Sequence, residues 1–342
     1  MSRKPTLLTI ILNYKTAEMT LDAVVAALRE MQGQSAFDGR LIVVDNDSQD
    51  GSFERLAGEV AARGWSDVEV LQSGHNGGFG AGNNVGILAG CADQMPDYIY
   101  ILNSDAFVDK GAISALVEAL ESHPDAGFAG SYIHGPDGDA HMTTFRFPSI
   151  FSEFEGAARF GPISRLLARY RVPLGVPDTT QEVDWLAGAS LMMRTSVLRD
   201  IGLFDERFFL YFEETDLCRR AALAGYPTLF VRESKVTHIG SVSTGMKTWT
   251  RMPDYWFKSR QYYFTKNHGA VYASMATVAH VAGGLLWRLR ALIQRKPQAD
   301  PDHFLQDLVF HNLRANPTNT EGQAGSKIPQ LPSVSQSIGE VQ

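Results

Sequence analysis

Residues 41–51 read LIVVDNDSQDG, an apolar run that ends at Asp45 and continues into a polar turn closed by glycine. A short run rich in valine and isoleucine is typical of a buried strand in a parallel sheet. Asp47 and Asp50 are interpreted as residues that cap the turn and the following helix. Asp45 leaves the strand directly, so we expect it to accept a hydrogen bond from a ring N–H of a ligand.

The same strand-then-helix unit recurs through the first third of the chain. Apolar runs at 7–12, 41–44, 68–71 and 98–102 alternate with helical patterns at 20–31, 53–63, 83–91 and 112–121. This alternation predicts an α/β fold with a mostly parallel sheet and helices on both faces. Ligands of such sheets bind at the carboxyl ends of the strands, so the polar residues that follow each strand should meet in one cleft.

Composition narrows the class of protein. A formal net charge of −7 argues against a nucleic-acid-binding protein, which normally carries a basic surface. The only two cysteines, Cys91 and Cys218, are far apart in the sequence. This spacing predicts reduced thiols in a cytoplasmic protein and no zinc site. The basic N-terminus precedes an apolar run that is too short for a signal peptide, and we interpret that run as the first strand.

Changes in pattern divide the chain into segments. We predict a catalytic domain at 1–254, a helical extension at 255–315 and a disordered tail at 316–342 that is rich in Pro, Ser, Gln and Gly. Within the domain we expect a nucleotide-binding half at 1–130, an insertion or lid at 141–183 and an acceptor or catalytic half at 184–245. The insertion carries several prolines and a short basic helix with Arg159, Arg165, Arg169 and Arg171.

A glycine-rich loop, NGGFGAGNNVG, occupies residues 76–86. Its backbone N–H groups could approach a phosphate or a sugar, or the glycines could simply form a tight turn between strand and helix. Asn83 stands where a dinucleotide fingerprint would have its third glycine, which disfavours an oxidoreductase. The pair Asn83 and Asn84 favours ligand contact, because asparagine is a poor residue inside a helix.

Asp105 follows the fourth apolar run and is the candidate metal ligand. A carboxylate there could bind a hard divalent cation that bridges phosphate oxygens, or it could begin a turn. His238, in the segment THIGSVSTG, could add an imidazole, although a lone histidine is more often structural. The hydroxyls of Ser241, Ser243 and Thr244 in the same segment would suit phosphate.

The segment FDERFFLYFEETDLCRR, residues 204–220, places Glu213, Glu214 and Asp216 in the first turn of a predicted helix. Acidic residues there can simply cap the helix. Alternatively, an ionised carboxylate beside an aromatic run could accept a proton from a hydroxyl in a partly dry cleft.

Six segments in this order resemble the inverting family 2 glycosyltransferases, specifically their non-processive bacterial branch with rhamnosyltransferase-like enzymes. They are ILNYKT, VVDNDSQDG, NGGFGAGNNVGI, ILNSDAFVD, the segment from Trp185 to Arg220, and THIGSVST. The resemblance runs from about Leu7 to Lys266 and implies a GT-A fold.

The resemblance also implies roles for individual residues. Glu214 takes the place of the general base, with Glu213 as runner-up, and Asp105 with His238 would bind Mg²⁺ or Mn²⁺. Asp45 would bind the pyrimidine base of the nucleotide. The nucleotide-binding set implied is Asn13, Tyr14, Asp45, Asn76, Gly78, Phe79, Asn84, Asn103 and Ser104. The acceptor-binding set implied is Trp185, Gly188 and Ala189.

Two positions depart from the family pattern. The metal motif begins with Asn103 instead of Asp, and the base is Glu214 where many relatives have Asp.

The QxxRW signature of processive synthases is absent. The resemblance thus implies transfer of one or a few sugars, rhamnose among them, from a UDP- or dTDP-sugar to a glycan or lipid-linked acceptor in cell-surface polysaccharide synthesis. The alternatives are a sugar-phosphate nucleotidyltransferase and a non-catalytic carbohydrate-binding protein on the same fold.

Residues 270–287 form a nearly uncharged stretch followed by Arg288, Arg290, Arg295 and Lys296. The stretch could be a helix packed on the catalytic domain, an interfacial helix or a membrane span. We expect a cytoplasmic protein with possible peripheral contact at the inner membrane.

Overall fold

The computed structural model describes residues 3–32, 36–240, 249–297, 300–314 and 328–332. Its strands are β1 Thr6–Asn13, β2 Asp38–Asp45, β3 Val68–Gln72, β4 Tyr98–Asn103, β5 Ala106–Val108, β6 Phe128–His134, β7 Thr144–Phe145, β8 Pro173–Gly175, β9 Gln181–Val183, β10 Trp185–Leu186, β11 Ser190–Arg194 and β12 Thr228–His238. Its helices are α1 Ala17–Met31, α2 Ser52–Arg63, α3 Phe79–Asp93, α4 Ala112–Ser122, α5 Ile150–Ala158, α6 Gly161–Leu166, the 3₁₀ turn η1 Ala168–Tyr170, α7 Thr195–Ile201, α8 Glu213–Leu223, α9 Asp254–His268, α10 Ala270–Gln294 and α11 Phe304–Arg314.

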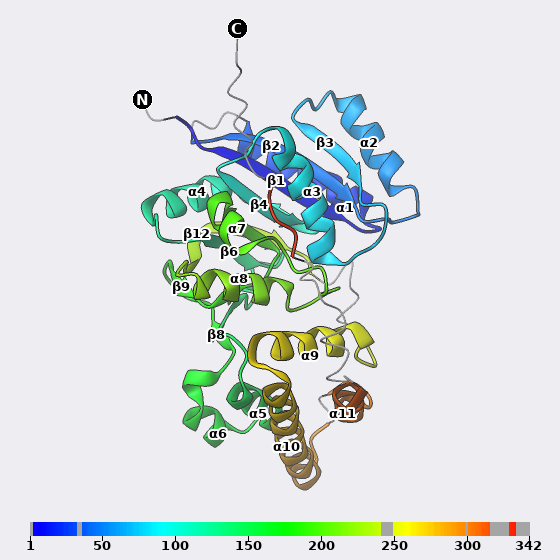
Figure 1. Ribbon diagram of the computed structural model, residues 1–342, viewed down its shortest axis with the longest axis vertical. Coiled ribbons are helices and arrows are strands. Elements are labelled where there is room, and N and C mark those ends of the chain that lie inside the picture. The colour runs from blue at the N-terminus through cyan, green and yellow to red at the C-terminus, as the bar shows by residue number, and fades with distance from the viewer. Residues whose placement is uncertain (1–2, 33–35, 241–248, 298–299, 315–327, 333–342) are drawn as a thin grey trace.

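One large sheet forms the body of the protein, with the strand order β3-β2-β1-β4-β11-β6-β12-β5 and β9 paired to β12 (Figure 1). The first four strands in this order are parallel, as the alternation of strands and helices predicts. From β11 onward the sheet is mixed, because β11 runs antiparallel to both β4 and β6. A second sheet of three strands has the order β10-β7-β8.

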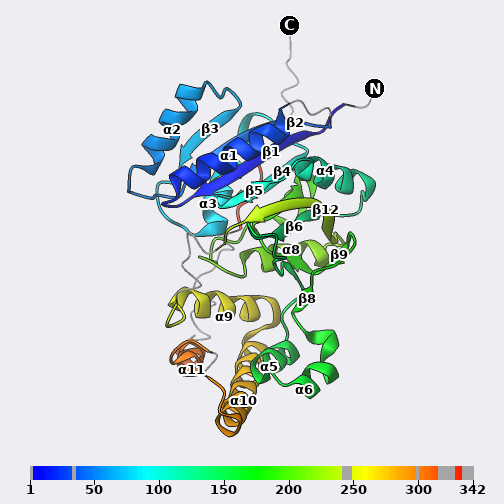
Figure 2. The same ribbon diagram turned by 180° about the vertical axis from the view of Figure 1, so that it is seen from behind.

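Alternate residues of β1 point into two hydrophobic cores, one on each face of the sheet. Leu7 and Ile11 belong to the core beneath α1, α2 and α4, whereas Leu8 and Ile10 belong to the core beneath α3, α7 and α8. This alternation is the period of two that a strand imposes on its side chains. Figure 2 shows α1 crossing the face of the sheet opposite to the one seen in Figure 1. The predicted α/β fold with helices on both faces is confirmed.

Helix α3 begins at Phe79, four residues before the start that the sequence pattern predicted. The glycines of the 76–86 loop thus serve mostly for packing. A Cβ at Gly82 would lie 2.5 Å from a methyl group of Leu12, and one at Gly86 would lie 2.9 Å from Ile10. The glycine-rich stretch therefore lets α3 lie close against β1.

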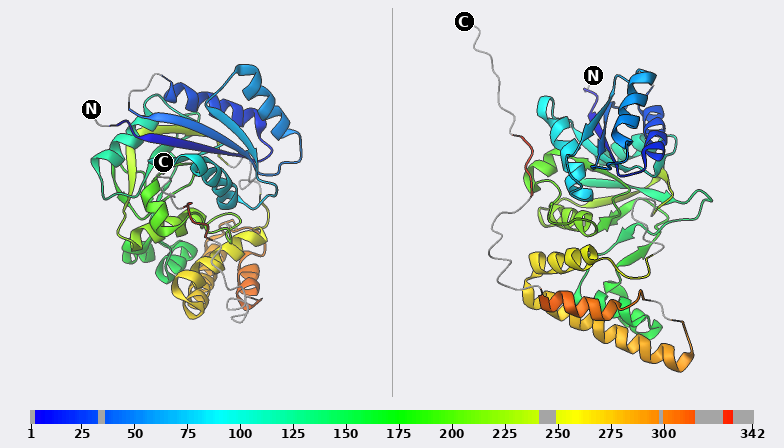
Figure 3. Two further views of the ribbon diagram at one scale, coloured as in Figure 1. Left: turned by 45° about the horizontal axis from the view of Figure 1, so that its top comes forward. Right: turned by 90° about the vertical axis from the view of Figure 1, so that its right-hand side faces the viewer.

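Helices α5 and α6 of the predicted insertion, residues 141–183, lie beside the C-terminal helices and away from the parallel half of the sheet (Figures 1 and 3), whereas its strand β9 pairs with β12 of the large sheet. Its helix α5 packs along α10. A buried ion pair of 2.6 Å between Arg260 of α9 and Glu153 of α5 joins the two segments. Burial alone would raise the pKa of Glu153, but the charges of Arg260 and His280 lower it to about 2. Insertion and extension thus form one helical end of the molecule.

Five residues of the predicted disordered tail, 328–332, lie against the catalytic domain. The backbone N–H of Leu203 donates to the Pro329 carbonyl at 3.0 Å, and Leu331 is buried in the core beneath α7 and α8. The prediction of disorder therefore does not hold for these five residues, because Leu331 supplies an apolar anchor that the polar composition of the tail conceals.

Candidate active site

A cavity of about 510 Å³ lies at the carboxyl ends of the parallel strands. It is lined by Leu12, Tyr14, Asn46, Asn76, Gly78, Phe79, Asn103, Ser104, Asp105, Ala187, Gly188, Ala189, Phe209, Leu210, Tyr211, Glu213, Glu214, His238 and Tyr255. These residues come from both halves of the domain and from α9. The predicted cleft is thus confirmed in place, and both the candidate base and the candidate metal ligand face it.

Asp105 and His238 meet because of how the strands pair. β12 runs antiparallel to β5 with His238 opposite Ala106, so the imidazole lies beside the residue that precedes β5. His238 Nε2 is 3.1 Å from Asp105 Oδ1. Burial raises the pKa of Asp105, but the hydrogen bond and the charge of His238 outweigh it, and the net pKa is below the ordinary value. Asp105 is therefore ionised at neutral pH.

The surroundings of this pair fit a divalent cation. Asn103 Oδ1 is buried and has no hydrogen-bond partner among the described residues, and Asn103 Nδ2 is 3.4 Å from His238 Nε2. The described lining residues include three acidic side chains and no lysine or arginine. Carboxylate, amide oxygen and imidazole suit Mg²⁺ or Mn²⁺. Within the described residues there is no cluster of three or more His, Cys, Asp and Glu side chains that could hold a metal ion.

Glu213 and Glu214 reach the cavity from the start of α8, as the sequence predicted. Tyr211 and Phe212, just before the helix, both have positive φ, at 69° and 71°. Such angles are rare for bulky residues, and they are found most often at functional sites. The turn they form brings the helix start, and both carboxyl groups, to the wall of the cavity.

The two carboxyl groups differ in exposure and in pKa. Glu213 is 2% exposed, and burial together with the adjacent Glu214 raises its pKa well above the ordinary value. Glu214 keeps some exposure to the cavity; burial raises its pKa to about 7, while the backbone N–H of Gly188 acts in the opposite direction. Among the described residues, one oxygen of each carboxyl group has no hydrogen-bond partner. Burial thus favours the neutral form of Glu213, the less exposed of the two, whereas Glu214 can take up and release a proton near neutral pH.

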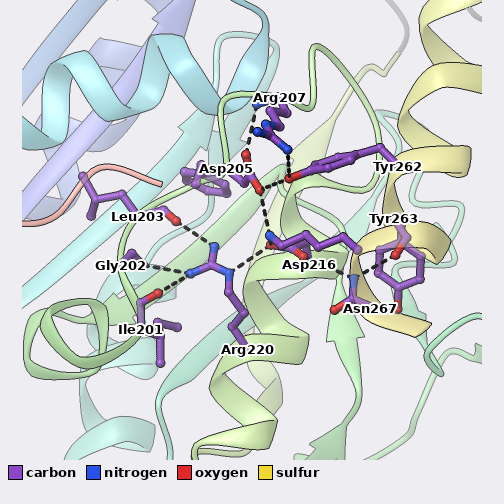
Figure 4. A network of polar contacts seen from close by, with 12 residues as sticks. Ile201, Gly202, Leu203, Asp205, Arg207, Asp216, Arg220, Tyr262, Tyr263 and Asn267 are labelled. Atoms are coloured by element: carbon purple, nitrogen blue, oxygen red, sulfur yellow. Dashed lines mark hydrogen bonds and ion pairs between the residues drawn. The ribbon is translucent and has the colours of Figure 1, made fainter. Parts of the chain in front are cut away.

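A buried polar network fixes α8 in place (Figure 4). Lys266 of α9 donates to Asp205 at 2.8 Å and to Asp216 of α8 at 2.7 Å. Arg220 donates to Asp216 and to the carbonyl oxygens of residues 201–203. The helical extension therefore holds the acidic helix through a charged contact, and Asp216 is a structural residue of the turn that carries Glu213 and Glu214.

Some predicted site residues lie behind the cavity wall. Asp45 is 1% exposed; its Oδ1 accepts from Asn13 Nδ2 at 2.7 Å and from Ser48 Oγ at 2.6 Å. Its Oδ2 accepts the backbone N–H of Ser48 at 3.1 Å. Asp45 and Asn13 therefore close the turn after β2, and the expectation that they contact a nucleotide is not supported by this geometry.

Asn84 and Trp185 are the other two residues placed away from the wall. The Asn84 side chain donates to the Phe204 carbonyl at 2.9 Å and accepts from the Phe204 N–H at 3.1 Å. It binds α3 to the loop before α8, which explains an asparagine inside a helix. Trp185 stacks on Phe145 at 4.2 Å between ring centroids, in the small sheet. Asn83 donates to Phe79 O within α3.

The remaining predicted residues line the cavity, namely Tyr14, Asn76, Gly78, Phe79, Asn103, Ser104, Gly188, Ala189, Asp105, His238, Glu213 and Glu214. Position 78 requires a glycine, because its φ is 91° and because a Cβ there would lie 1.8 Å from the Phe209 carbonyl oxygen. Ser241, Ser243 and Thr244 lie outside the described residues.

Asn46 and Tyr211 line the cavity as well, and sequence reasoning placed them near the cleft without giving either a role in the site; Tyr255 was missed. Asn46 directly follows Asp45, and its burial with an unpartnered Oδ1 marks it as the residue of that turn that faces the cavity. Tyr255 comes from α9 and is brought in by tertiary packing alone, so no local signal could have found it.

Comparisons with known proteins agree with this geometry. A family model for Glycosyl transferase family 2 matches residues 9–199. An N-acetylglucosaminyl-diphospho-decaprenol L-rhamnosyltransferase of Mycobacterium tuberculosis is 31% identical over 214 residues, which cover 60% of this chain and 68% of that protein. Rhamnosyltransferase WbbL of Escherichia coli K12 is 26% identical over 164 residues, covering 47% of this chain and 60% of that protein.

Among solved structures, a mannosyltransferase from Pyrobaculum calidifontis in complex with GDP-Man and Mn²⁺ has a TM-score of 0.56 at 12% identity, and the match covers 94% of this chain and 84% of that one. The fold is thus that of the GT-A glycosyltransferases. The family model covers more than half of the chain, and the chain belongs to glycosyl transferase family 2, as a hexosyltransferase.

Proposed function

We propose that this glycosyltransferase moves a sugar from a UDP- or dTDP-sugar to a hydroxyl of a glycan or lipid-linked saccharide, with inversion at the anomeric carbon. The observation that carries the proposal is one cavity with Asp105 and His238 on its wall together with a carboxyl group, Glu214, whose pKa lies near neutrality. The family match favours this function over a nucleotidyltransferase or a non-catalytic carbohydrate-binding protein. Because the M. tuberculosis and E. coli relatives are rhamnosyltransferases, we propose rhamnose as the sugar and cell-surface polysaccharide as the product.

In this mechanism Glu214 is the general base. Its free carboxylate oxygen accepts the proton of the acceptor hydroxyl as that oxygen attacks the anomeric carbon. The bond from the anomeric carbon to the diphosphate breaks in the same displacement, and the electron pair leaves with the nucleoside diphosphate. Burial and the neighbouring Glu214 raise the pKa of Glu213, which favours its neutral form and so limits the negative charge beside the base.

Asp105, His238 and the unpartnered oxygen of Asn103 would hold Mg²⁺ or Mn²⁺. When bound, such a cation neutralises the charge that builds up on a departing diphosphate. With one carboxylate in this set instead of two, we expect metal affinity to depend strongly on the phosphate oxygens of the donor.

For the nucleotide base we propose Asn46 in the role that the sequence suggested for Asp45. Asn46 Nδ2 donates to Asn76 Oδ1 at 3.0 Å, and Asn46 Oδ1 has no partner among the residues that the structure describes, although Asn46 lines the cavity wall. A carbonyl oxygen there can accept the ring N–H that uracil and thymine share.

The pH dependence of turnover tests the role of Glu214. Because burial raises the pKa of Glu214 to about 7, the base is protonated and inactive below that value. We therefore expect turnover to fall as the pH is lowered through about 7, with a slope of one proton. Steady-state rates at saturating donor across the acidic range measure this. A rate that stays constant down to the ordinary carboxyl range would remove Glu214 from the role.

A thermal-shift panel of UDP- and dTDP-sugars with Mn²⁺ tests the donor. A ligand at about a hundred times its dissociation constant adds about 2.7 kcal/mol of stability, so the true donor should raise the melting temperature visibly. The panel includes dTDP-rhamnose, UDP-sugars and GDP-mannose. Stabilisation by GDP-mannose alone would contradict the proposed pyrimidine nucleotide.

A further inference from the structure

Helix α10 presents an apolar face that no other described residue covers, at the end of the molecule farthest from the N-terminal strands (Figure 3, right). Its large exposed apolar residues are Val271, Met275, Val278, Leu285, Leu289, Leu292 and Ile293. Val278 is 68% exposed and Leu292 is 78% exposed. Most successive members are three or four residues apart, the gap of seven between Val278 and Leu285 holds the exposed Ala282, and Ile293 adjoins Leu292, so they form one stripe along the helix. We call these seven residues the apolar stripe.

The charged residues of α10 and of the two residues after it are all positive, whereas Asp300 and Asp302 lie past them, in a hollow that Leu292 and Lys296 also line. Asp300 is paired with Arg159 at 2.6 Å. Residues 270–296 contain no Asp or Glu, although the chain as a whole has a net charge of −7. Arg288, Arg295 and Lys296 are exposed at the end of the helix. Trp287 lies among cations, with Lys296 Nζ at 5.8 Å and the Arg290 guanidinium at 5.9 Å from its ring. An apolar face bordered by tryptophan and cations is the pattern of a helix that lies on an anionic bilayer.

Neighbouring elements extend this surface. α6 and η1, which follow α5 at the same end of the molecule (Figure 1), carry Arg165 and Arg169, and Leu166 between them is 82% exposed. α11 adds exposed Phe310 and Leu313. Apolar and basic side chains are thus gathered at one end of an otherwise acidic protein, which suits attraction to anionic headgroups.

The opposite face of α10 is packed against other helices of the protein. This packing argues against α10 being a membrane-spanning helix. By length and composition α10 could cross a membrane. However, Gly283 and Gly284 let neighbours approach closely: a Cβ at Gly283 would lie 2.5 Å from the Phe154 carbonyl oxygen, and one at Gly284 would lie 2.9 Å from Leu305. Lipid cannot surround the helix while α5 and α11 occupy that face.

A second copy of the chain would suit the apolar stripe less well than a lipid bilayer does. Helices that pair through such a stripe normally carry charges of both signs beside it, and these set the partner and the orientation. Here the charges that α10 itself and residues 295 and 296 carry are all positive, so two copies paired through this helix would bring arginines together. We propose that the apolar stripe and its basic border bind the surface of an anionic lipid bilayer, with α10 lying in the interface. The active-site cavity, which α9 helps to line, is then held near the membrane.

The test is co-sedimentation of the full chain with vesicles of phosphatidylcholine containing about a third phosphatidylglycerol. The variant carries Leu285→Glu and Leu289→Glu, which alter two exposed positions and leave the core intact. Leu223→Glu is the matched control, because Leu223 is 72% exposed on α8, outside this surface. We expect the wild-type chain and the control to sediment, and the double variant to bind at least about tenfold more weakly.

A second variant, with Arg288, Arg295 and Lys296 changed to Gln, separates charge from apolar contact. It should bind the anionic vesicles more weakly, and wild-type binding should fall as salt is raised or when pure phosphatidylcholine is used. All variants should keep the stabilisation by UDP and Mn²⁺ without vesicles, so this result is independent of the proposed reaction. The proposal is overturned if the wild-type chain stays in the supernatant or the double variant sediments equally. It is also overturned if sedimentation velocity without vesicles finds a dimer that the double variant loses.

Discussion

Glu214→Gln should lower the turnover number by about a hundredfold or more, the usual size of a lost general base. Glutamine keeps the shape of the side chain but cannot accept the proton of the acceptor hydroxyl. Donor affinity should stay the same, because the proposed nucleotide and metal contacts come from other segments of the wall. Initial rates with the donor identified by the thermal-shift panel, at saturating acceptor, measure the effect.

Glu213→Gln is the matched control, one residue away in the same helix turn. Because Glu213 is 2% exposed and burial with the adjacent Glu214 raises its pKa well above the ordinary value, we expect its replacement to cost about tenfold in rate at most. If the Glu213 variant loses the larger factor, the base is Glu213 and the assignment of Glu214 is wrong.

The same Glu214→Gln variant should be more stable than the wild-type protein at alkaline pH. The folded-state pKa of Glu214, about 7, lies above the ordinary value of 4.5, so the folded protein binds the proton more tightly than the unfolded chain. The stability that this contributes is full below pH 4.5 and is lost as the pH rises through 7. Glutamine removes the loss, which is on the order of 3 kcal/mol for such a shift. Urea unfolding at several pH values should give curves for the two proteins that meet in acid and diverge in base. Equal stability at every pH would mean that Glu214 is not perturbed by burial.

Asp105→Ala should abolish the metal-dependent part of nucleotide binding. Asp105 is the only acidic side chain within hydrogen-bond distance of His238 among the described residues, and its pKa keeps it ionised. Without it, His238 and Asn103 offer no charged ligand for Mn²⁺. Thermal shifts with UDP, with and without Mn²⁺, should then be equal, whereas the wild-type protein should gain stability only when both are present.

Asp109→Ala is the control for this experiment, because Asp109 lies just past β5, is 42% exposed and is not a lining residue of the cavity. It should keep the full response to Mn²⁺. A Mn²⁺ response retained by Asp105→Ala would place the metal ligands elsewhere on the wall.

The parallel half of the sheet could be predicted from sequence because its signals are local. Buried strands such as β1 and β4 are continuous apolar runs, and the residue after each run lies at the ligand edge. Asp105 and Glu214 could be proposed from the sequence for the same reason. Asp105 closely follows a strand, and Glu214 lies at the start of a helix that aromatic residues precede.

The positions that sequence could not decide depend on long-range contacts. Asp45 and Asn46 are adjacent and both polar, and only the turn bound to Asn13 and Ser48 determines which of them faces the cavity. An asparagine inside a helix suggested that Asn84 binds a ligand. Its actual partner, Phe204, is 120 residues away in the sequence, so no local pattern could reveal it. Likewise, Lys266 anchors α8 only because the helical extension packs against it. No local sequence pattern predicts that packing.

A calorimetric titration with UDP in the presence of Mn²⁺, run in parallel on Glu214→Gln and Asp105→Ala, tests the central claim most directly. If the cavity holds a cation on one wall and a base on another, Glu214→Gln binds UDP as the wild-type protein does, Asp105→Ala binds it only weakly, and both variants fail to transfer sugar. Loss of binding in Glu214→Gln, or unchanged Mn²⁺-dependent binding in Asp105→Ala, would contradict it.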